Sequence, residues 1–419
     1  MATGTILSNA LTNFAHAAKL LDGEIDAAIL EKIQQPKERI ELTMGPQMDD
    51  GKVHLYKAFI VRHNDALGPA KGGIRMTPNV TLDDVTGLAM EMTWKTALIG
   101  VPFGGGKSGI VADPAKLSHF NKETLIRSFS RSGRRHIGPQ IYVPAPDMGT
   151  NETDMGYLKD AISYSEGMAT TQGCYVTGKP VVVGGIPGRR EATGRGVVAC
   201  VAAALKDHGI DARRATAVVQ GFGNVGAATV AALDLLGVKV IAVSDINGAI
   251  HHPEGLDVGR LNEHMRNKGK VVGFAGGKAI DPKAMLELNC DVLIPAAAAN
   301  QITADNASRI NARLIAEGAN SPTSPEADQI LNQRGILVIP DILCNAGGVF
   351  VSYLEYTQET QQEQMAEEEV NTRLQQRMMS RYSQVKSLAA ERKIPLRDAA
   401  MCLALRSVHA AVMAKGLLP

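Results

Sequence analysis

The chain has 419 residues, of which 45% are hydrophobic and 21% are charged, and its formal net charge is +1 at pH 7. This length predicts two or three domains with sizeable cores. The balanced charge excludes a general electrostatic attraction to nucleic acid or to an anionic membrane surface. The sequence has no run of about 18 apolar residues of the kind that spans a membrane, and residues 1–22 predict an amphipathic helix in place of a signal peptide.

Helical and strand patterns alternate through the first part of the chain. Apolar residues at spacings of three and four predict helices, and alternation predicts strands within residues 38–62. The segment GPAKGGIRM is rich in glycine and predicts a loop. The glycines at Gly104–Gly106 end a helical pattern and predict a close approach of the backbone to another group. The predicted helices cover approximately residues 10–35, 81–99, 121–137 and 152–169.

The composition changes around residues 178–195, where GKPVVVGGIPGRREATGRG is rich in glycine and proline and predicts a hinge. The segments that follow repeat the order of strand, loop and helix, which is typical of a parallel sheet. Residues 358–394 predict a long exposed helix, and residues 396–418 predict an apolar helix that packs back on the first domain.

Three lysines and one aspartate lie in segments with almost no other charge. Lys71 lies in GPAKGGIRM, Lys95 in MTWKTA, Lys107 in PFGGGKSGI and Asp147 in PAPDMGT. The small and apolar residues around them predict that the lysines are partly withdrawn from water, where an ammonium group needs an anionic partner. Such a cluster suits a doubly anionic substrate and a proton-transfer step.

A glycine-rich turn follows a later apolar strand and opens a helix. Gly221, Gly223 and Gly226 occur there in the order GFGNVG. The first glycine permits a tight turn, the second lets a pyrophosphate approach the backbone, and the third lets helix and strand pack closely. The turn, including Asn224 and Val225, therefore predicts a dinucleotide at the positive end of the helix.

Asp245 lies at the end of the next apolar strand, 19 residues after Gly226, where an acid accepts the ribose hydroxyls of NAD. The next five residues contain no arginine or lysine for a 2′-phosphate, although His251 and His252 follow. The sequence therefore favours NAD as the cofactor and leaves NADP open.

Cysteines and histidines give no metal-binding pattern. The five cysteines are far apart and include no C-x-x-C pair, and His63 and His136 lack the spacing of metal ligands. We therefore expect no metal, and the cysteine usage favours a cytoplasmic protein.

The motifs together resemble those of the glutamate, leucine, phenylalanine and valine dehydrogenase family, and within it the small hexameric glutamate dehydrogenases. The resemblance covers nearly the whole chain, in the order GPAKGGIR, MTWKTAL, PFGGGKSGI, VPAPDMGT, EATGRG, GFGNVG, EGANSPT and NAGGVFVSYLE. It implies two α/β domains around a cleft. We expect a substrate-binding and oligomerisation domain at 1–183, a Rossmann-like dinucleotide-binding domain at 184–353, and a C-terminal helical segment at 354–419 that packs on the first domain.

The resemblance implies roles for the charged residues. Lys71, helped by Ser352, corresponds to the residue that binds the substrate's side-chain carboxylate, and Lys95 to the one that binds the α-carboxylate. Lys107 corresponds to the catalytic lysine and Asp147 to the carboxylate that transfers protons. The implied reaction is the reversible oxidative deamination of L-glutamate to 2-oxoglutarate and ammonium, with hydride transfer to NAD(P).

The resemblance also implies further cofactor contacts. Thr193 and Asn320 match positions near the nicotinamide end, and Asn345 opens the loop that closes over the site. Two residues depart from the family pattern, namely Ala299 in place of a glutamate and Tyr356 in place of a tryptophan. These departures leave details of cofactor binding and subunit packing open, and a homohexamer is implied by the resemblance alone.

Two alternatives remain open. Relatives that act on leucine, phenylalanine or valine carry an apolar residue at the position of Lys71, and a buried ammonium facing an apolar substrate would cost several kcal/mol. Lys71 and Ser352 therefore favour glutamate over a branched-chain or aromatic amino acid. The second alternative is a non-catalytic sensor of glutamate or nucleotide on the same scaffold, against which the presence of Lys107 and Asp147 argues.

Overall fold

The computed structural model describes residues 6–167 and 173–416, so the remaining residues of the expected domain ranges lie outside the description. The chain divides into two compact units, each with its own sheet and helices, which confirms the two-domain α/β class. The C-terminal segment expected at 354–419 is shared between the units, and the domain boundaries themselves stay a prediction. The first unit comprises Met1–Pro187, Phe350–Glu367 and Met401–Pro419, and the second comprises Gly188–Val349 and Glu368–Ala400.

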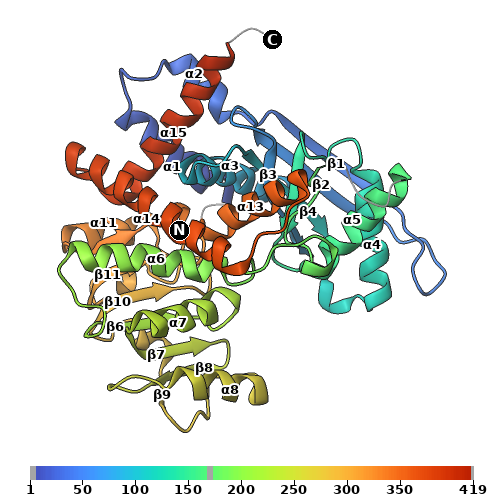
Figure 1. Ribbon diagram of the computed structural model, residues 1–419. Coiled ribbons are helices and arrows are strands. Elements are labelled where there is room, and N and C mark those ends of the chain that lie inside the picture. The colour runs from blue at the N-terminus through green and yellow to red at the C-terminus, as the bar shows by residue number, and fades with distance from the viewer. Residues whose placement is uncertain (1–5, 168–172, 417–419) are drawn as a thin grey trace. The chain divides into compact units, whose positions relative to one another are not determined.

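A five-stranded mixed sheet forms the centre of the first unit (Figure 1). Its strand order is β1-β2-β4-β3-β5, in which only β2 runs opposite to the other strands. Parallel pairing of β3 with β4 and β5 brings the same ends of these three strands together. The strands are β1 (Glu38–Met44), β2 (Tyr56–Asn64), β3 (Ala70–Thr77), β4 (Gly104–Val111) and β5 (Tyr142–Pro146).

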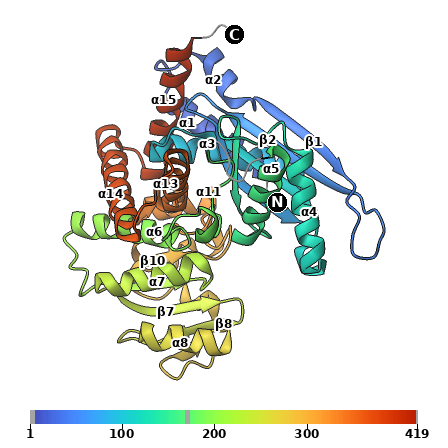
Figure 2. The same ribbon diagram turned by 45° about the vertical axis from the view of Figure 1, so that its right-hand side comes forward.

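Helices cover both faces of this sheet. On β2, Ala58 and Ile60 pack with α4 and α5, whereas Phe59 and Val61 face α3, as the alternation of a strand requires. Figure 2 shows α4 and α5 side by side next to β1 and β2. The helices that contribute to this unit are α1 (Ile6–Leu20), α2 (Ala27–Gln34), α3 (Leu82–Ile99), α4 (His119–Ser132), α5 (Glu152–Glu166), α13 (Gly347–Gln361) and α15 (Leu396–Lys415), with short 3-10 turns at Pro114–Lys116 and Val181–Val183.

A seven-stranded sheet forms the centre of the second unit, in the order β12-β11-β10-β6-β7-β8-β9. The strands from β12 to β7 are parallel, and β8 and β9 extend that edge with antiparallel pairing. The chain leaves β6 for β7 on one side and later returns to β10 on the other side. The strands are β6 (Thr216–Gln220), β7 (Lys239–Asp245), β8 (Gly248–His251), β9 (Lys278–Ile280), β10 (Cys290–Pro295), β11 (Ala312–Ala316) and β12 (Leu337–Ile339).

Helices α6 and α7 pack against each other on this sheet (Figure 1). Helix α14 begins at the boundary of the unit and lies almost wholly within it. No helix among the described residues is both long and apolar enough to cross a membrane. The helices of the second unit are α6 (Ala192–Asp207), α7 (Asn224–Leu236), α8 (Val258–Lys268), α9 (Pro282–Met285), α10 (Ala304–Ala307), α11 (Pro325–Gln333), α12 (Asp341–Cys344) and α14 (Glu367–Arg392).

The glycine-rich segment GPAKGGIRM is strand β3, and the predicted loop was wrong. A Cβ at Gly72 would overlap the carbonyl group of Gly106 on β4, and one at Gly73 would lie 2.7 Å from the Cβ of Asp147. These glycines therefore permit close approach within an interior strand, a use of glycine that composition alone does not distinguish from a turn.

Candidate functional site

Two of the predicted lysines lie on neighbouring strands of the first unit. Lys71 on β3 pairs with Gly105 of β4, which precedes Lys107 by two positions. Because alternate residues of a strand point to the same face, both lysines lie on one face of the sheet. Lys71 is 2% exposed and Lys107 is 5% exposed, so both ammonium groups are withdrawn from water.

Glycine at position 105 brings α3 close to this face. A Cβ there would overlap Thr93 of α3, so any larger residue would push the helix away. Met92 of α3 faces Gly72 of β3, and Lys95 lies one turn further along the same side of the helix. Lys95 is also buried. Lys71 and Lys107 therefore share the face of the sheet that α3 covers, and Lys95 is buried on that helix.

Asp147 directly follows β5 and is bound to two cationic side chains. Lys107 Nζ donates a hydrogen bond to Asp147 Oδ2, and the Arg75 guanidinium lies 3.4 Å from Oδ1. The N–H of Met148 donates to the same Oδ1 at 2.6 Å. Burial acts to raise the pKa of Asp147, but the charges of Lys107 and Arg75 outweigh it and lower the pKa to about 2. The carboxyl group is therefore ionised at neutral pH.

The loop that carries Asp147 is fixed to the neighbouring strand. Thr150 Oγ1 accepts a hydrogen bond from the N–H of Asp147 at 2.9 Å and donates one to the carbonyl oxygen of Ile74 at 2.8 Å. This bridge holds the carboxylate over β3, next to the space left by Gly73. The sequence placed Lys107 and Asp147 in one site, and the structure brings them into contact.

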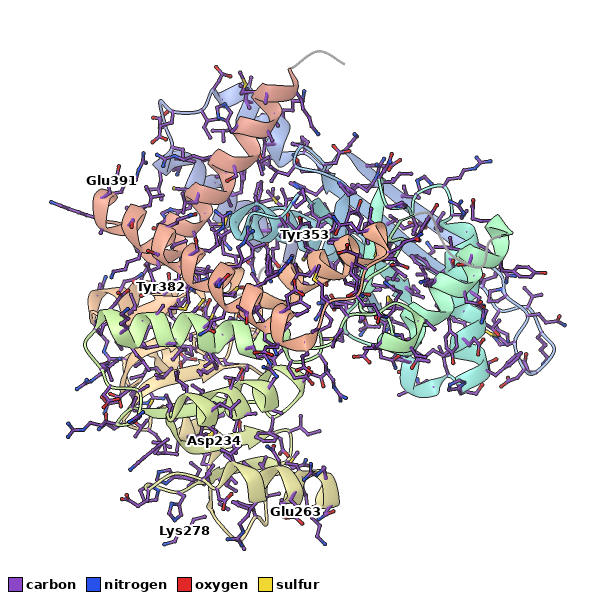
Figure 3. The ribbon with its side chains drawn as sticks, viewed as in Figure 1. Asp234, Glu263, Lys278, Tyr353, Tyr382 and Glu391 are labelled. Atoms are coloured by element: carbon purple, nitrogen blue, oxygen red, sulfur yellow. The ribbon has the colours of Figure 1, made fainter. Side chains whose placement is uncertain are left out.

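Ser352 lies on α13, which packs beside the beginning of β4. The ring of Phe103, two residues before Gly105, makes edge-to-face contacts with Tyr353 and Tyr356 of this helix, with centroid distances of 6.0 and 5.1 Å. Figure 3 labels Tyr353 on α13. Tyr356 also donates a hydrogen bond from its hydroxyl to the carbonyl oxygen of Pro139. Ser352 is buried one turn before Tyr356, in the part of the unit that contains Lys71.

The predicted dinucleotide motif lies between β6 and α7 of the second unit. Gly221 has a φ of 95°, and a Cβ there would lie 2.7 Å from the carbonyl oxygen of Ala296, beyond β10. A Cβ at Gly226 would overlap the carbonyl oxygen of Gly221, whereas no atom lies within 4 Å of a Cβ at Gly223. The first glycine thus serves the turn, the third serves the packing of α7, and the second leaves an open approach to the helix.

The amino end of α7 is suited to an anion. The N-cap residue Gly223 offers no side-chain cap, and the first hydrogen bond of the helix runs from the N–H of Ala227 to Gly223. The first N–H groups, at Asn224 and Val225, have no partner within a helix and point along its positive end. This end lies where the order of parallel strands reverses between β6 and β10, which is where α/β sheets bind ligands.

Asp245 is the last residue of β7, the strand next to β6. Its carboxylate accepts hydrogen bonds from the N–H groups of Asn247 and Val271, at 2.7 and 2.8 Å. Asn247 Nδ2 donates a third, longer hydrogen bond to Oδ2 at 3.4 Å. The carboxylate is therefore held in place, and Oδ1 keeps a lone pair that can accept from a hydroxyl group.

Asn345, Asn320 and Thr193 come from three separate segments of the second unit. Asn345 Nδ2 donates hydrogen bonds to Asn320 Oδ1 at 3.0 Å and to the carbonyl oxygen of Ala319 at 3.1 Å. A Cβ at Gly348, three residues after Asn345, would lie 2.7 Å from Thr193 Oγ1. Asn345 Oδ1 is buried and has no hydrogen-bond partner among the described residues. An orphaned acceptor of this kind fits the amide N–H of a nicotinamide carboxamide.

Two family models match the chain. The one described as Glu/Leu/Phe/Val dehydrogenase, dimerisation domain, covers residues 36–164, and the one described as Glutamate/Leucine/Phenylalanine/Valine dehydrogenase covers residues 184–416. The chain belongs to this family.

Similar members of the family are glutamate dehydrogenases. The glutamate dehydrogenase of Thermotoga maritima is 46% identical over 411 residues, covering 98% of each chain. The NAD-specific glutamate dehydrogenase A of Halobacterium salinarum is 43% identical over 413 residues, covering 99% of this chain and 94% of the other. The solved structure of hetero-hexameric glutamate dehydrogenase from Thermus thermophilus, in its Leu-bound form, has a TM-score of 0.93 at 34% identity, covering 99% of this chain and 98% of that one.

Sequence reasoning missed Arg75 among the residues of the first unit. Arg75 lies four positions after Lys71 on β3, so both residues point to the face that contains Asp147. The period of two would have identified Arg75 if GPAKGGIRM had been read as a strand. In this family member the catalytic candidate Asp147 therefore has two cationic partners, Lys107 and Arg75.

Proposed function

We propose that the buried lysines and Asp147 of the first unit carry out amino-acid dehydrogenation on L-glutamate. The chain is an enzyme that catalyses the reversible oxidative deamination of L-glutamate to 2-oxoglutarate and ammonium, with NAD as the hydride acceptor. The observation that carries the residue assignment is the pair of buried lysines, Lys71 and Lys107, on one face of the sheet under α3, with Lys107 bound to an ionised Asp147.

Lys71 and Lys95 would bind the two carboxylates of the substrate. An ammonium group withdrawn from water interacts strongly with a carboxylate, so each lysine favours a substrate that supplies one. Lys71, with Ser352, would hold the side-chain carboxylate, and Lys95 would hold the α-carboxylate. Two fixed anchors leave the Cα–H bond in one orientation, which supplies the positioning part of catalysis.

The residues of the second unit fit a dinucleotide. Gly221, Gly223, Asn224, Val225 and Gly226 would hold the pyrophosphate, because they combine an open approach with free N–H groups at the start of α7. When bound, NAD supplies the carbon that accepts the hydride.

Polar side chains of the second unit would hold the two ends of the cofactor. Asp245 would accept the ribose hydroxyls. Thr193, Asn320 and Asn345 would hold the nicotinamide end, where the orphaned Asn345 Oδ1 would accept a hydrogen bond from the carboxamide.

Proton transfer would fall to Asp147 and Lys107. Asp147 is ionised at neutral pH, as a group that takes a proton from the substrate's ammonium must be. Loss of hydride from Cα leaves a substrate iminium, which water attacks. Lys107, after releasing its own proton to solvent, would accept the proton of that water. Asp147 would return its proton to the nitrogen, and as the C–N bond breaks the hydroxyl proton would pass to the departing ammonia. The products are then 2-oxoglutarate, ammonium and the reduced cofactor.

We also propose that the first unit forms the subunit contacts of a homohexamer and that the protein acts in the cytoplasm. Support for the assembly comes from the family description of residues 36–164 as a dimerisation domain and from the hexameric assembly of the Thermus thermophilus relative. Light scattering of the purified chain would test the homohexamer, and a stable dimer or monomer would contradict it.

The reaction is tested by NAD reduction with L-glutamate, L-leucine and L-phenylalanine as alternative substrates. We expect turnover of glutamate and rates at least about 10²-fold lower for the two apolar amino acids, because neither supplies an anion to Lys71. Preference for leucine or phenylalanine would contradict the assignment of Lys71. The absence of turnover with all three would favour a sensor on the same scaffold.

A further inference from the structure

Arg397, at the start of α15, lies among three carboxylates within the second unit. Its Nη2 lies 2.7 Å from Glu317 Oε1, its Nε lies 3.3 Å from Asp328 Oδ2, and its Nη1 lies 3.6 Å from Asp341 Oδ1. The Glu317 side chain is wholly buried, and the other two are nearly so. The Arg397 side chain is itself 22% exposed, but the acids that it pairs with are not, so its removal leaves uncompensated negative charge on buried carboxylates, unlike the loss of an exposed surface pair.

Two of these carboxylates fix the loop that follows β11. Glu317 Oε2 accepts the N–H of Asp341 at 2.8 Å, and Asp341 Oδ2 accepts the N–H of Ser321 at 2.8 Å. Ser321 has a φ of 47°, and its carbonyl oxygen accepts the N–H of Asn300 at 3.0 Å. A non-glycine residue keeps this left-handed conformation only where its surroundings impose it.

The loop fixed in this way carries one of the residues assigned to the nicotinamide end. Asn320 lies between Glu317 and Ser321, and it accepts a hydrogen bond from Asn345 at 3.0 Å. Asn345 directly follows α12, the helix that begins at Asp341. Glu317 therefore lies at the start of the loop that carries Asn320, and Asp341 begins the helix that precedes Asn345. Arg397 pairs with both carboxylates.

We infer that Arg397 is a positioning residue for the nicotinamide end of the dinucleotide site. Through Glu317 and Asp341 it sets the places of Asn320 and Asn345, and it contacts neither cofactor nor substrate itself. Without the guanidinium, the buried carboxylates repel one another, so the loop after β11 separates from α12. The inference rests on the proposed function of the two asparagines.

The test compares NADH with ADP-ribose, which has the adenosine, pyrophosphate and second ribose but no nicotinamide. In the full chain, Arg397→Met should weaken NADH binding by about tenfold or more, the scale of a displacement below about 1 Å at a positioned group. ADP-ribose binding should change by less than about twofold. Hydrogen exchange of residues 317–324 in the ligand-free protein should become faster.

Arg309→Met is the matched control, because it removes an arginine that pairs with Glu287 at 2.7 Å on the exposed surface of the same unit. It should leave both affinities unchanged. If Arg397→Met does not fold, Arg397→Lys keeps the charge but loses the planar fork, and it should weaken NADH in the same direction by a smaller factor.

Equal weakening of both ligands, or no weakening of either in a folded variant, would overturn the inference and leave Arg397 a purely structural residue. Different results would refute the proposed function itself. A wild-type chain that binds neither ligand would refute the dinucleotide site itself. If Asn345→Ala did not weaken NADH, the role of Asn345 would be wrong, and the inference about Arg397 would fall with it.

Discussion

The two candidate sites, one in each unit, use different chemical groups. In the first unit, the proposed binding groups are charged side chains: Lys71 and Lys107 lie on strands, Lys95 lies on α3, and Asp147 directly follows β5. In the second unit, the pyrophosphate site is made of backbone, and its main requirement is that side chains are absent at Gly221. Removal of a side chain should therefore damage the first site, whereas addition of one should damage the second.

The largest expected effect follows from removing the catalytic ammonium group. Lys107→Ala should lower kcat for glutamate by about 10²- to 10⁴-fold, the range of general acid–base catalysis. NADH affinity should stay within about twofold, because the dinucleotide residues belong to the other unit. Lys57→Ala is the control, since Lys57 lies on the same sheet but has a side chain that is 62% exposed and pairs with Glu41. Near-normal turnover of Lys107→Ala would refute its catalytic role.

A change of selectivity should follow from replacing the lysine that faces the side chain. Lys71→Leu should lower kcat/KM for 2-oxoglutarate and raise it for 2-oxoisocaproate, changing their ratio by about 10²-fold or more. Initial rates of NADH oxidation with ammonium measure this ratio. A parallel loss on both substrates would mean that position 71 does not determine selectivity.

Two glycine substitutions, each adding one methyl group, test the proposed pyrophosphate site of the second unit. Gly226→Ala places a Cβ on the carbonyl oxygen of Gly221 and should lower the free energy of unfolding by about 1–3 kcal/mol, as overpacking does. Gly223→Ala meets open space, so it should leave stability within about 0.5 kcal/mol while weakening NADH. Thermal melting and NADH titration separate the two effects, and equal stability losses would contradict the assigned packing.

The smallest expected effect concerns the second cation at Asp147. The pKa of this group is lowered from 3.8 to about 2 in the folded chain, so its ionisation stabilises the fold above the unfolded pKa, and this stabilisation is lost as the pH falls to about 2. Arg75→Gln should raise the folded pKa and lower the stability at pH 7 by about 1 kcal/mol. Melting curves from pH 7 down to pH 2 should show a constant difference between variant and wild type near neutral pH, which shrinks as the pH approaches 2. A difference that does not change with pH would contradict this origin.

A contrast between local and long-range contacts explains which parts of the two candidate sites the sequence could predict. The GFGNVG turn is local, because strand, turn and helix follow one another, so spacing alone located Gly221, Gly223 and Gly226. The contact of Lys107 with Asp147 joins residues 40 positions apart, and it was expected only because the surrounding motifs resembled a family. Arg75 was missed because the glycines around it indicated a loop, whereas the structure uses them to pack β3 tightly.

The buried ion pairs were beyond prediction from the sequence. Arg397 is separated from Glu317 by 80 positions, and nothing in either segment indicates the partner. Residues 358–394 were expected to form a long exposed helix. Only the tertiary fold determines that a single arginine just beyond it lies among Glu317, Asp328 and Asp341.

The most direct test of the roles of Lys71 and Lys95 compares inhibition by two acids. Glutarate carries both carboxylates of the substrate but no amino group, and butyrate carries a single carboxylate. If Lys71 and Lys95 each bind a carboxylate, glutarate should compete with 2-oxoglutarate at least about tenfold more strongly than butyrate, and Lys71→Leu should remove that difference. Equal inhibition by the two acids in the wild-type enzyme would contradict recognition of a doubly charged substrate by these lysines.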